Sequence, residues 1–269
     1  EVLKNTVDYL DENGDIRDAS LTDNLPNSGS GSLNGAFGGG DNGYAGFDSL
    51  GNLQGTSTSD RYLFYDQIDG TNSQGYKVDS SGATGYDSYI NALNLLSNAD
   101  EYDINMIAIP GITQGNGGGI VSKAIDVCED RGDCFVIADP TNWGAAMSTA
   151  ITNVGGYDSN YAAMYYPWIQ VNDNQSGMFR WVPPSTVMGG IYAFNDKVAH
   201  PWFAPAGLNR GGIETAIQAE RKLTHGNRDD LYDANVNPIA TFPGQGVTVW
   251  DQKTLQKKAS ALDRINVRR

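Results

Sequence analysis

The residues best placed to do chemistry lie in a glycine-rich stretch, residues 111–119. This stretch separates an apolar run from a helical pattern, which is where phosphate-binding loops are found. A dinucleotide-binding loop that begins at Gly115 needs a third glycine at position 120, where the chain has Ile120. A P-loop needs a Gly-Lys-Ser or Gly-Lys-Thr triplet, which the sequence lacks. We therefore interpret the stretch as a plain flexible connection that binds no cofactor.

Hydrolytic chemistry also lacks its usual carriers. The sequence contains neither a Gly-x-Ser-x-Gly nor a His-Glu-x-x-His string, the patterns typical of serine hydrolases and zinc proteases. Of the two histidines, His200 precedes Pro201, and His225 lies beside Gly226 at the expected end of a helix, where an imidazole can meet unpaired carbonyls. We expect structural or solvent-facing roles for both histidines and no catalytic residue.

Two other groups have metal-ligand chemistry without the matching spacing. Residues 11–15 are rich in side-chain oxygens, but an EF-hand loop needs glycine and glutamate where this chain has Ile16 and Thr22. Cys128 and Cys134 are six residues apart, which suits no zinc motif, and two cysteines make no disulfide framework. We expect no metal site, and two cysteines that are buried as small apolar residues in a reduced cytoplasm.

Composition favours a globular protein and argues against two classes of partner. The 269 residues carry a formal net charge of −14, and residues 1–100 alone hold 15 acidic and 4 basic side chains. Such a surface repels nucleic-acid phosphate, so we expect no nucleic-acid partner. No apolar run approaches the roughly 20 residues that span a bilayer, so we expect no membrane partner.

The elements that position these residues fall into two predicted regions. Residues 1–86 are dense in glycine, asparagine, serine and aspartate, which indicates tight turns between short strands. Residues 61–65 are the clearest strand candidate there. We predict a loop-rich, β-rich and acidic region at 1–86, followed by an α/β core at 87–269.

The second region alternates helices and strands. A helix capped by Asp87 or Ser88 precedes an apolar strand at 104–109 that Pro110 and Gly111 close, and a helix from about Gly119 leads to an apolar strand at 135–138. Strand, crossover helix and strand make a βαβ unit with two buried parallel strands. The predicted fold class is α/β (α+β), a mixed sheet with flanking helices.

Further along, four more elements are predicted. Residues 161–168 and 178–181 are typical of strands around a polar loop, and residues 185–196 and 213–223 are typical of helices. Four large aromatic side chains are assigned to the core: Tyr165, Trp168, Trp181 and Trp202.

A set of short motifs in the last ninety residues carries a family resemblance. A Val-Pro-Pro-Ser element opens a helix that ends in a Gly-x-Tyr-Ala-x-x-Asp pattern, and an Ala-Pro-Ala element, an Asn-Pro pair, a Gly-rich turn with a tryptophan, a Thr-Leu pair and an Asn-Val-Arg-Arg end follow in order. Here these motifs are Val182-Pro183-Pro184-Ser185, Gly190-Ile191-Tyr192-Ala193-Phe194-Asn195-Asp196, Trp202-Phe203-Ala204-Pro205-Ala206-Gly207, Asn237-Pro238, Gly244-Gln245-Gly246-Val247-Thr248-Val249-Trp250, Thr254-Leu255 and Asn266-Val267-Arg268-Arg269. The chain resembles contractile bacteriophage tail sheath proteins, departing at Asp251-Gln252, where a Gly-Ala pair is expected.

The resemblance implies a structural subunit of the virion tail that is made in the bacterial host cytoplasm. Such subunits polymerise with copies of themselves as hexameric rings around a tail tube, meet baseplate and tail terminator proteins, and contract to drive the tube through the host envelope. Against the family's layout, residues 44–86 are interpreted as an insertion. The terminal arms that link neighbours in this family are missing, so we interpret the chain as a protease-resistant core fragment and expect the isolated fragment to be a monomer.

The resemblance also suggests where neighbouring copies meet. The acidic first hundred residues would face a basic surface of an adjacent subunit, which fixes register more than it adds affinity. The candidate residues for that basic surface are Lys253, Lys257, Lys258, Arg264, Arg268 and Arg269.

Two other functions stay open at the level of sequence. One is an α/β hydrolase of the phage particle, whose sign would be a pocket in which acidic residues and His200 converge. The other is a calcium-stabilised surface or adhesin module, whose sign would be stability that depends on calcium.

Overall fold

The structure is a computed structural model that describes residues 78–173 and 178–268, all within one compact unit, Tyr65–Arg269. The described helices are α3 (Thr84–Leu96), α4 (Gln114–Arg131), α5 (Met147–Val154), α6 (Ser185–Val198), α7 (His225–Asp233), the 3-10 turn η3 (Ala261–Asp263) and α8 (Ile265–Arg268). The described strands are β1 (Met106–Thr113), β2 (Phe135–Asp139), β3 (Ala162–Tyr166), β4 (Ile169–Asp173), β5 (Met178–Val182), β6 (Ala216–Ala219), β7 (Asn237–Phe242) and β8 (Gly246–Val249).

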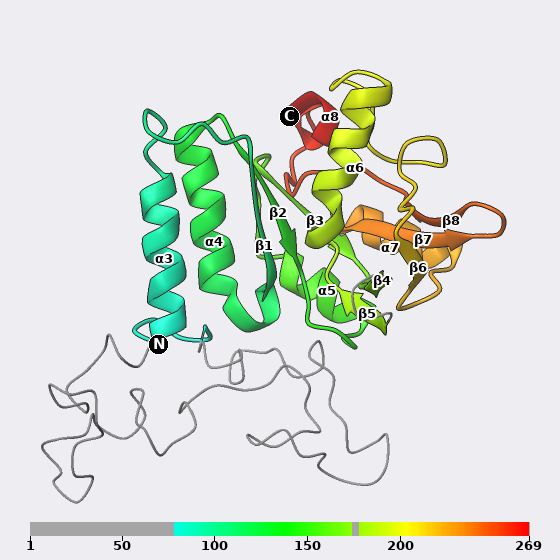
Figure 1. Cartoon of the computed structure of the whole chain (residues 1–269), viewed down its shortest axis with the longest axis horizontal. Helices are drawn as coiled ribbons and strands as arrows, with labels where there is room; N and C mark the ends of the chain where they lie inside the picture. Colours follow the sequence, from blue (N-terminus) through cyan, green and yellow to red (C-terminus); the bar gives the residue numbers. More distant parts are fainter. Residues whose placement is uncertain (1–77, 174–177, 269) are drawn as a thin grey trace, which may run out of the picture. The chain divides into compact units, whose positions relative to one another are not determined.

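A five-stranded mixed sheet in the order β1-β2-β3-β7-β8 forms the centre of the fold (Figure 1). The first four strands run parallel, and β8 returns antiparallel to β7 as a hairpin. β1 and β2 pair in parallel across α4, which confirms the predicted βαβ unit. A second, three-stranded antiparallel sheet has the order β5-β4-β6. The α/β (α+β) class with flanking helices is thereby confirmed.

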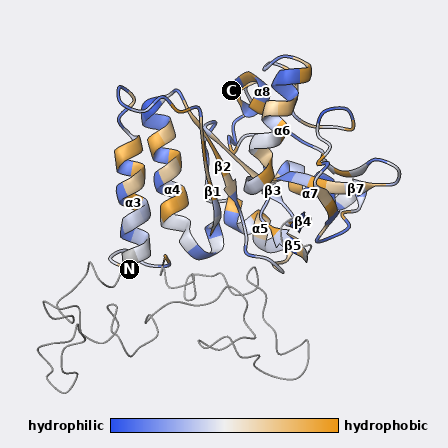
Figure 2. Cartoon of the chain, in the orientation of Figure 1, coloured by the Kyte–Doolittle hydropathy of each residue, from blue (hydrophilic) through white to orange (hydrophobic). Residues whose placement is uncertain are grey.

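The central sheet is buried on both faces, because alternate residues of its inner strands enter two different cores. Val136 and Ala138 of β2 pack with α3, α4 and α5, whereas Phe135 and Ile137 pack with α6. α3 and α4 lie side by side on the first face (Figure 1). Figure 2 shows the three strands β1, β2 and β3 mostly in hydrophobic colours and the two helices striped. Strands that are buried on both faces have continuous apolar sequences, and this is why β2 was predicted accurately from the sequence.

The glycine-rich stretch is the end of β1 and the kinked first turns of α4, with the kink at Gly117, so its interpretation as a flexible connection is wrong. Thr113 caps α4: its Oγ1 accepts from the backbone N of Gly115 and Asn116, and Asn116 Oδ1 accepts from the backbone N of Thr113 at 2.7 Å. Glycine leaves room in this helix for a neighbouring side chain. A Cβ on Gly119 would lie 2.6 Å from the hydroxyl oxygen of Tyr86 in α3. The glycines thus allow α3 and α4 to approach each other.

The strand before this helix runs further than predicted. β1 continues through Pro110 and Gly111 to Thr113, where sequence analysis ended the strand at residue 109. Its pairing with β2 is interrupted between Ala108 and Thr113. An edge strand tolerates a proline there because the missing N–H faces no ladder partner. Strand pairing resumes at Thr113, which lies opposite Asp139.

The predicted helix at 213–223 is wrong. Residues 216–219 form β6, which pairs antiparallel with β4, and Gln218 Nε2 donates to Gln170 Oε1 at 2.8 Å. The helix after it is α7, and His225 opens this helix instead of ending one. The predicted helix at 185–196 is confirmed as α6, and the first predicted helix begins at Thr84, three residues before the boundary at 87.

Residues 1–77 lie outside the described part of the chain. The loop- and β-rich region at 1–86, the insertion at about 44–86 and the acidic stretch at 11–15 therefore stay predictions. Among the described residues, no helix is long and apolar enough to cross a membrane.

Candidate functional site

The candidate site is built at the end of α6, whose start is fixed in the core. Pro183 and Pro184 precede the helix, as suits its first turn, where no backbone N–H partner is needed. Ser185 donates from its backbone N at 3.0 Å and from Oγ at 2.5 Å to the carboxylate of Asp139. Both residues are buried. The end of β2 therefore sets the position of α6. The position of α6 in turn sets where the next segment of the chain begins.

We name that following segment, residues 199–210, the aromatic loop. Asn195, which is fully buried in α6, donates from Nδ2 to the carbonyls of His200 at 3.3 Å and Phe203 at 3.2 Å. The far end is held by Arg210, whose Nε donates to the carbonyl of Ala204 at 3.1 Å. These bonds replace the regular pairing that a loop lacks. The loop therefore has a defined backbone although it is neither helix nor strand.

This defined loop presents large apolar side chains to solvent. The Trp202 side chain is 65% exposed and its ring stacks on His200 at a centroid distance of 4.4 Å. The assignment of Trp202 to the core is therefore wrong, whereas Tyr165 and Trp168 are buried as predicted and Trp181 is only half-buried. The exposed apolar side chains of this region, on α6 and on the loop, are Phe194, Val198, Trp202, Phe203 and Leu208.

The exposure of these side chains on α6 and on the aromatic loop was not predicted from the sequence. Phe194 and Val198 are four residues apart and so share a face of α6. The helix itself was predicted, but its exposed and buried faces were not distinguished. Exposure of contiguous apolar side chains is uncommon on soluble monomers and marks interaction sites. These exposed apolar side chains make this region a candidate contact surface.

The predicted basic residues lie along the segment after β8 and contact the chain itself. Lys253 Nζ donates to the Tyr232 carbonyl at 2.8 Å, and burial, followed by nearby Arg264, lowers the pKa of this ammonium. Arg264 Nη2 donates to the Tyr232 hydroxyl at 2.9 Å. Together these two cations bind the segment to the end of α7.

The remaining basic residues are spread along the same segment. Lys257 Nζ donates to the Gly155 carbonyl at 2.6 Å, and the Arg268 guanidinium lies 3.5 Å from the centre of the Tyr161 ring. Lys258 is exposed, and Arg269 lies outside the described residues. Several of these side chains therefore hold the segment on its own core, and their role at a subunit interface stays a prediction.

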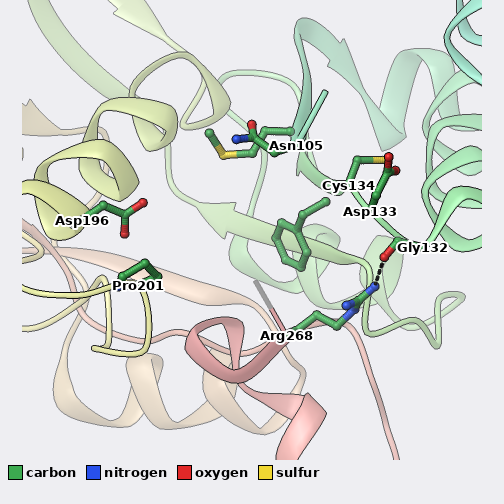
Figure 3. Close-up of a pocket in the computed structure, with 9 residues that line it drawn as sticks. Asn105, Gly132, Asp133, Cys134, Asp196, Pro201 and Arg268 are labelled. Carbon is green, nitrogen blue, oxygen red and sulfur yellow. Dashed lines mark hydrogen bonds between the residues drawn. The ribbon is translucent and has the colours of Figure 1, made fainter. Parts of the chain in front are cut away.

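A cavity of about 340 Å³ opens where β1 and β2 begin (Figure 3). Asp133, before β2, and Asp196, on α6, line it on opposite sides, and Arg268 of α8 reaches the Gly132 carbonyl between them. His200 is not among its lining residues, since its ring lies on Trp202. The sign expected for a hydrolase was a pocket in which acidic residues converge with His200. This cavity does not have that arrangement.

The described residues also offer no group of three or more His, Cys, Asp or Glu side chains that could hold a metal ion. Asp139 is the one aspartate or glutamate that is buried among the described residues. It binds Ser185 and lies at the end of β2 inside the protein. Residues 82–255, more than half of the chain, match the family described as the phage tail sheath protein central domain.

The chain belongs to the phage tail sheath family.

Curated relatives agree with this membership. The chain is 39% identical over 133 residues to the tail sheath protein of Vibrio phage KVP40, a match that covers 49% of this chain and 19% of that protein. It is 30% identical over 167 residues to the tail sheath protein of Enterobacteria phage T4, covering 56% of this chain and 25% of that protein. It is 27% identical over 243 residues to the tail sheath protein of Salmonella phage ViI, a match that covers 82% of this chain and 38% of that protein. The chain therefore spans well under half the length of these sheath proteins.

Solved structures of the family share the fold. The sheath complex of an extracellular contractile injection system, PVC, in its contracted state aligns with a TM-score of 0.52 and 23% identity, covering 65% of this chain and 47% of that chain. The contracted helical sheath of the anti-feeding prophage aligns with a TM-score of 0.50 and 24% identity, covering 70% of this chain and 49% of that chain. The central mixed sheet with its flanking helices is thus the fold that these sheath structures share.

Proposed function

We propose that this chain is part of a structural subunit of a contractile tail sheath, which polymerises around a tail tube and contracts to drive the tube through the host envelope. The observation that carries the proposal is the family match over residues 82–255. In this function the subunit keeps its fold while it exchanges contacts, and the work comes from the free-energy difference between two sets of interfaces. A core buried on both faces of one sheet suits that requirement, because close-packed interiors deform little.

The proposed partners follow from the same membership. They are further copies of the subunit, arranged as hexameric rings in a helical sheath, together with the tail tube, baseplate and tail terminator proteins. The proposed location is the tail of the virion, after synthesis in the bacterial host cytoplasm. The proposed role is structural and not enzymatic, and it needs no cofactor.

The aromatic loop supports a role in contacts between subunits. Trp202 is exposed on a backbone that Asn195 fixes, and tryptophan is enriched among the residues that dominate binding energy at interfaces. The cationic Arg210 over the Phe203 ring, at 5.0 Å, adds a polar rim to this apolar surface. We place this surface among those that neighbouring subunits cover.

Electron microscopy of a full-length parent protein that contains this chain, expressed alone, tests the assembly proposal. The expected result is a set of ring-stacked helical tubes, and soluble monomers under assembly conditions would contradict it. Trp202→Ser should reduce tube formation. Leu95→Ser is the matched control, because Leu95 is 55% exposed on α3 and lies outside the aromatic loop. Equal assembly by the two variants would remove the aromatic loop from the proposal and leave assembly itself standing.

Salt dependence tests the proposed contact between basic and acidic surfaces. Lys258 is exposed near the end of the described chain, so Lys258→Glu should slow assembly of the parent protein at about 50 mM salt and have little effect at about 500 mM, where exposed charges are screened. If Lys258→Glu and the parent protein assemble at the same rate at both salt concentrations, this contact is contradicted. The isolated 269-residue chain is expected to be monomeric on sizing, and a stable hexamer would contradict that expectation.

A further inference from the structure

The two cysteines of the chain meet at the turn between α4 and β2. Cys128 lies in the last turn of α4 and Cys134 directly precedes β2. Gly132, in the left-handed region at φ 76°, ends the helix and reverses the chain, and its N–H donates to the Cys128 carbonyl at 2.9 Å. The two sulfur atoms are 2.8 Å apart. A disulfide bond is about 2.05 Å long, so a shift of under about 1 Å would join them.

The turn that carries the two thiols is held from several sides. The Arg131 side chain, 1% exposed, donates to the carbonyl of Tyr102 at 2.8 Å and to the Asp133 carboxylate at 2.8 Å. Arg268 Nη2 reaches the Gly132 carbonyl at 3.4 Å (Figure 3). These contacts fix the backbone on both sides of Gly132. The thiols therefore have a high effective concentration toward each other.

The two cysteines differ in their position relative to a neighbouring cavity. Cys134 is among the residues that line the cavity of about 340 Å³, where it lies beside Asp133 (Figure 3). Cys128 does not line this cavity, and both side chains are otherwise buried, Cys134 at 3% and Cys128 at 0% exposed. A cavity of this volume readily admits a small hydroperoxide. A small oxidant would therefore meet Cys134 first and Cys128 second.

We propose that Cys128 and Cys134 form an oxidation site for small hydroperoxides, in which Cys134 is oxidised first and Cys128 then closes an intramolecular disulfide. In the first step the Cys134 sulfur attacks one peroxide oxygen and the O–O bond breaks, giving Cys134 sulfenic acid and one water. In the second step the Cys128 sulfur displaces that oxygen as a second water, and the S–S bond forms. Overall two thiols are oxidised by two electrons while one hydrogen peroxide is reduced to two waters.

Burial sets the expected rate of this reaction. It raises the pKa of both thiols above the ordinary value, and the neighbouring sulfur raises that of Cys128 further. Since the thiolate is the reactive form, oxidation should be slow at neutral pH and should accelerate as the pH rises. The site therefore responds to sustained exposure to peroxide and not to brief exposure. This chemistry is independent of whether the chain assembles.

Intact-mass measurement of the pre-reduced 269-residue chain, treated with hydrogen peroxide in dilute solution, tests the proposal. The expected product is a monomer lighter by about 2 Da, with a peptide map that joins Cys128 to Cys134. Its thermal midpoint should rise by roughly 4 °C, because the new bond constrains the unfolded chain. A folded chain that keeps both thiols under conditions where the urea-unfolded chain forms the disulfide would overturn the proposal.

Two single variants test the order of the steps. In Cys128→Ala the sulfenic acid at Cys134 has no partner, so a dicarbonyl sulfenic-acid trap such as dimedone should label it. In Cys134→Ala the remaining thiol does not line the cavity, and labelling should be at least tenfold slower. Circular dichroism confirms that both variants are folded before they are compared. Equal labelling of the two variants, or faster labelling of Cys134→Ala, would overturn the assigned order.

Discussion

Asp139 and Ser185 join the end of a central strand to the first turn of α6 entirely inside the protein. The Asp139 carboxylate accepts from Ser185 N at 3.0 Å and from Ser185 Oγ at 2.5 Å, and Asp139 is 0% exposed. The two hydrogen bonds favour the charged carboxylate, but burial outweighs them and raises the pKa of Asp139 to about 7. The join between β2 and α6 is consequently sensitive to pH.

Stability should fall as the pH rises from about 4 to about 7. The folded chain keeps the Asp139 proton over this range, whereas the unfolded chain releases it near pH 3.8, so the unfolded state binds fewer protons and its free energy falls relative to the folded state. The contribution is present below pH 4 and is lost by about pH 7, and it amounts to about 4 kcal/mol at most. Asp139→Asn keeps a neutral group there and should reduce this slope, measured by urea unfolding at pH 5 and pH 8.

Asp100→Asn is the control for that experiment, because it makes the same side-chain replacement at an exposed position. Its unfolding free energy should follow the unmodified chain at both pH values. If Asp139→Asn and the unmodified chain lose the same stability between pH 5 and pH 8, the Asp139 carboxyl is not the group that titrates.

The second prediction concerns Asn237, a buried residue whose side chain makes three hydrogen bonds to the backbone of two other residues. Its Nδ2 donates to the carbonyls of Met164 at 3.1 Å and Lys253 at 2.8 Å, and its Oδ1 accepts from Lys253 N at 2.6 Å. Asn237→Ala leaves these buried groups unpaired and should lower the unfolding free energy by about 3 kcal/mol. Trypsin should also cleave faster after Lys253. Asn91→Ala, on the exposed face of α3, should change neither quantity appreciably, and a similar loss there would contradict the assignment.

A pair of adjacent glycines gives the third prediction. A Cβ on Gly211 would lie 2.5 Å from the Val249 carbonyl oxygen and 2.8 Å from Gly207 N, both of which are backbone atoms, whereas a Cβ on Gly212 meets nothing within 4 Å. Gly211→Ala should therefore cost about 2 kcal/mol, because backbone must move, and Gly212→Ala should change stability by under about 1 kcal/mol. Thermal unfolding of both variants checks this. Equal melting temperatures would mean that the segment at 207–211 repacks without cost.

The fourth prediction compares two tryptophans in the isolated chain. Trp168 is 4% exposed and its Nε1 donates to the Thr141 carbonyl at 2.9 Å, so Trp168→Ala should cost about 3 to 5 kcal/mol. Trp202→Ala removes a largely exposed ring and should cost under about 1 kcal/mol. Chemical denaturation separates the two. A large loss for Trp202→Ala would indicate that its stacking on His200 supports the fold, and would weaken the argument for a contact surface.

The elements that sequence predicted well are those in which local pattern and tertiary burial agree. β2 is apolar throughout and buried throughout, and α6 begins at the Pro-Pro pair that favours a first helical turn. The βαβ unit followed from these signals because a parallel pair requires a crossover. The sheath resemblance, carried by ordered motifs, was confirmed by the match over residues 82–255.

Where prediction failed, tertiary contacts override local preference. The glycines of α4 disfavour a helix by propensity, yet α4 forms, and the missing Cβ of Gly119 leaves room for the Tyr86 hydroxyl. The apolar spacing of Ile213, Ala216 and Ile217 fits a helix as well as a strand, and pairing with β4 decides for the strand. Neither contact is local, so no window of sequence contains it.

The candidate surface was hidden for a different reason. Tryptophan is usually buried, so composition favoured a core position for Trp202, and only the structure shows its 65% exposure. The contact between Cys128 and Cys134 was likewise not predicted, since their spacing matches no motif and the reversal at Gly132 brings them together.

The anchoring of the aromatic loop by Asn195 has a thermodynamic consequence for any partner. Ordering a mobile segment on binding costs about 0.5–1.5 kcal/mol for each immobilised side chain, in addition to the backbone. Residues 200 and 203 already have their carbonyls bound to Asn195 Nδ2 in the isolated chain. A partner that docks on Trp202 therefore meets a preorganised backbone, and it can leave and be replaced by another without the loop having to refold.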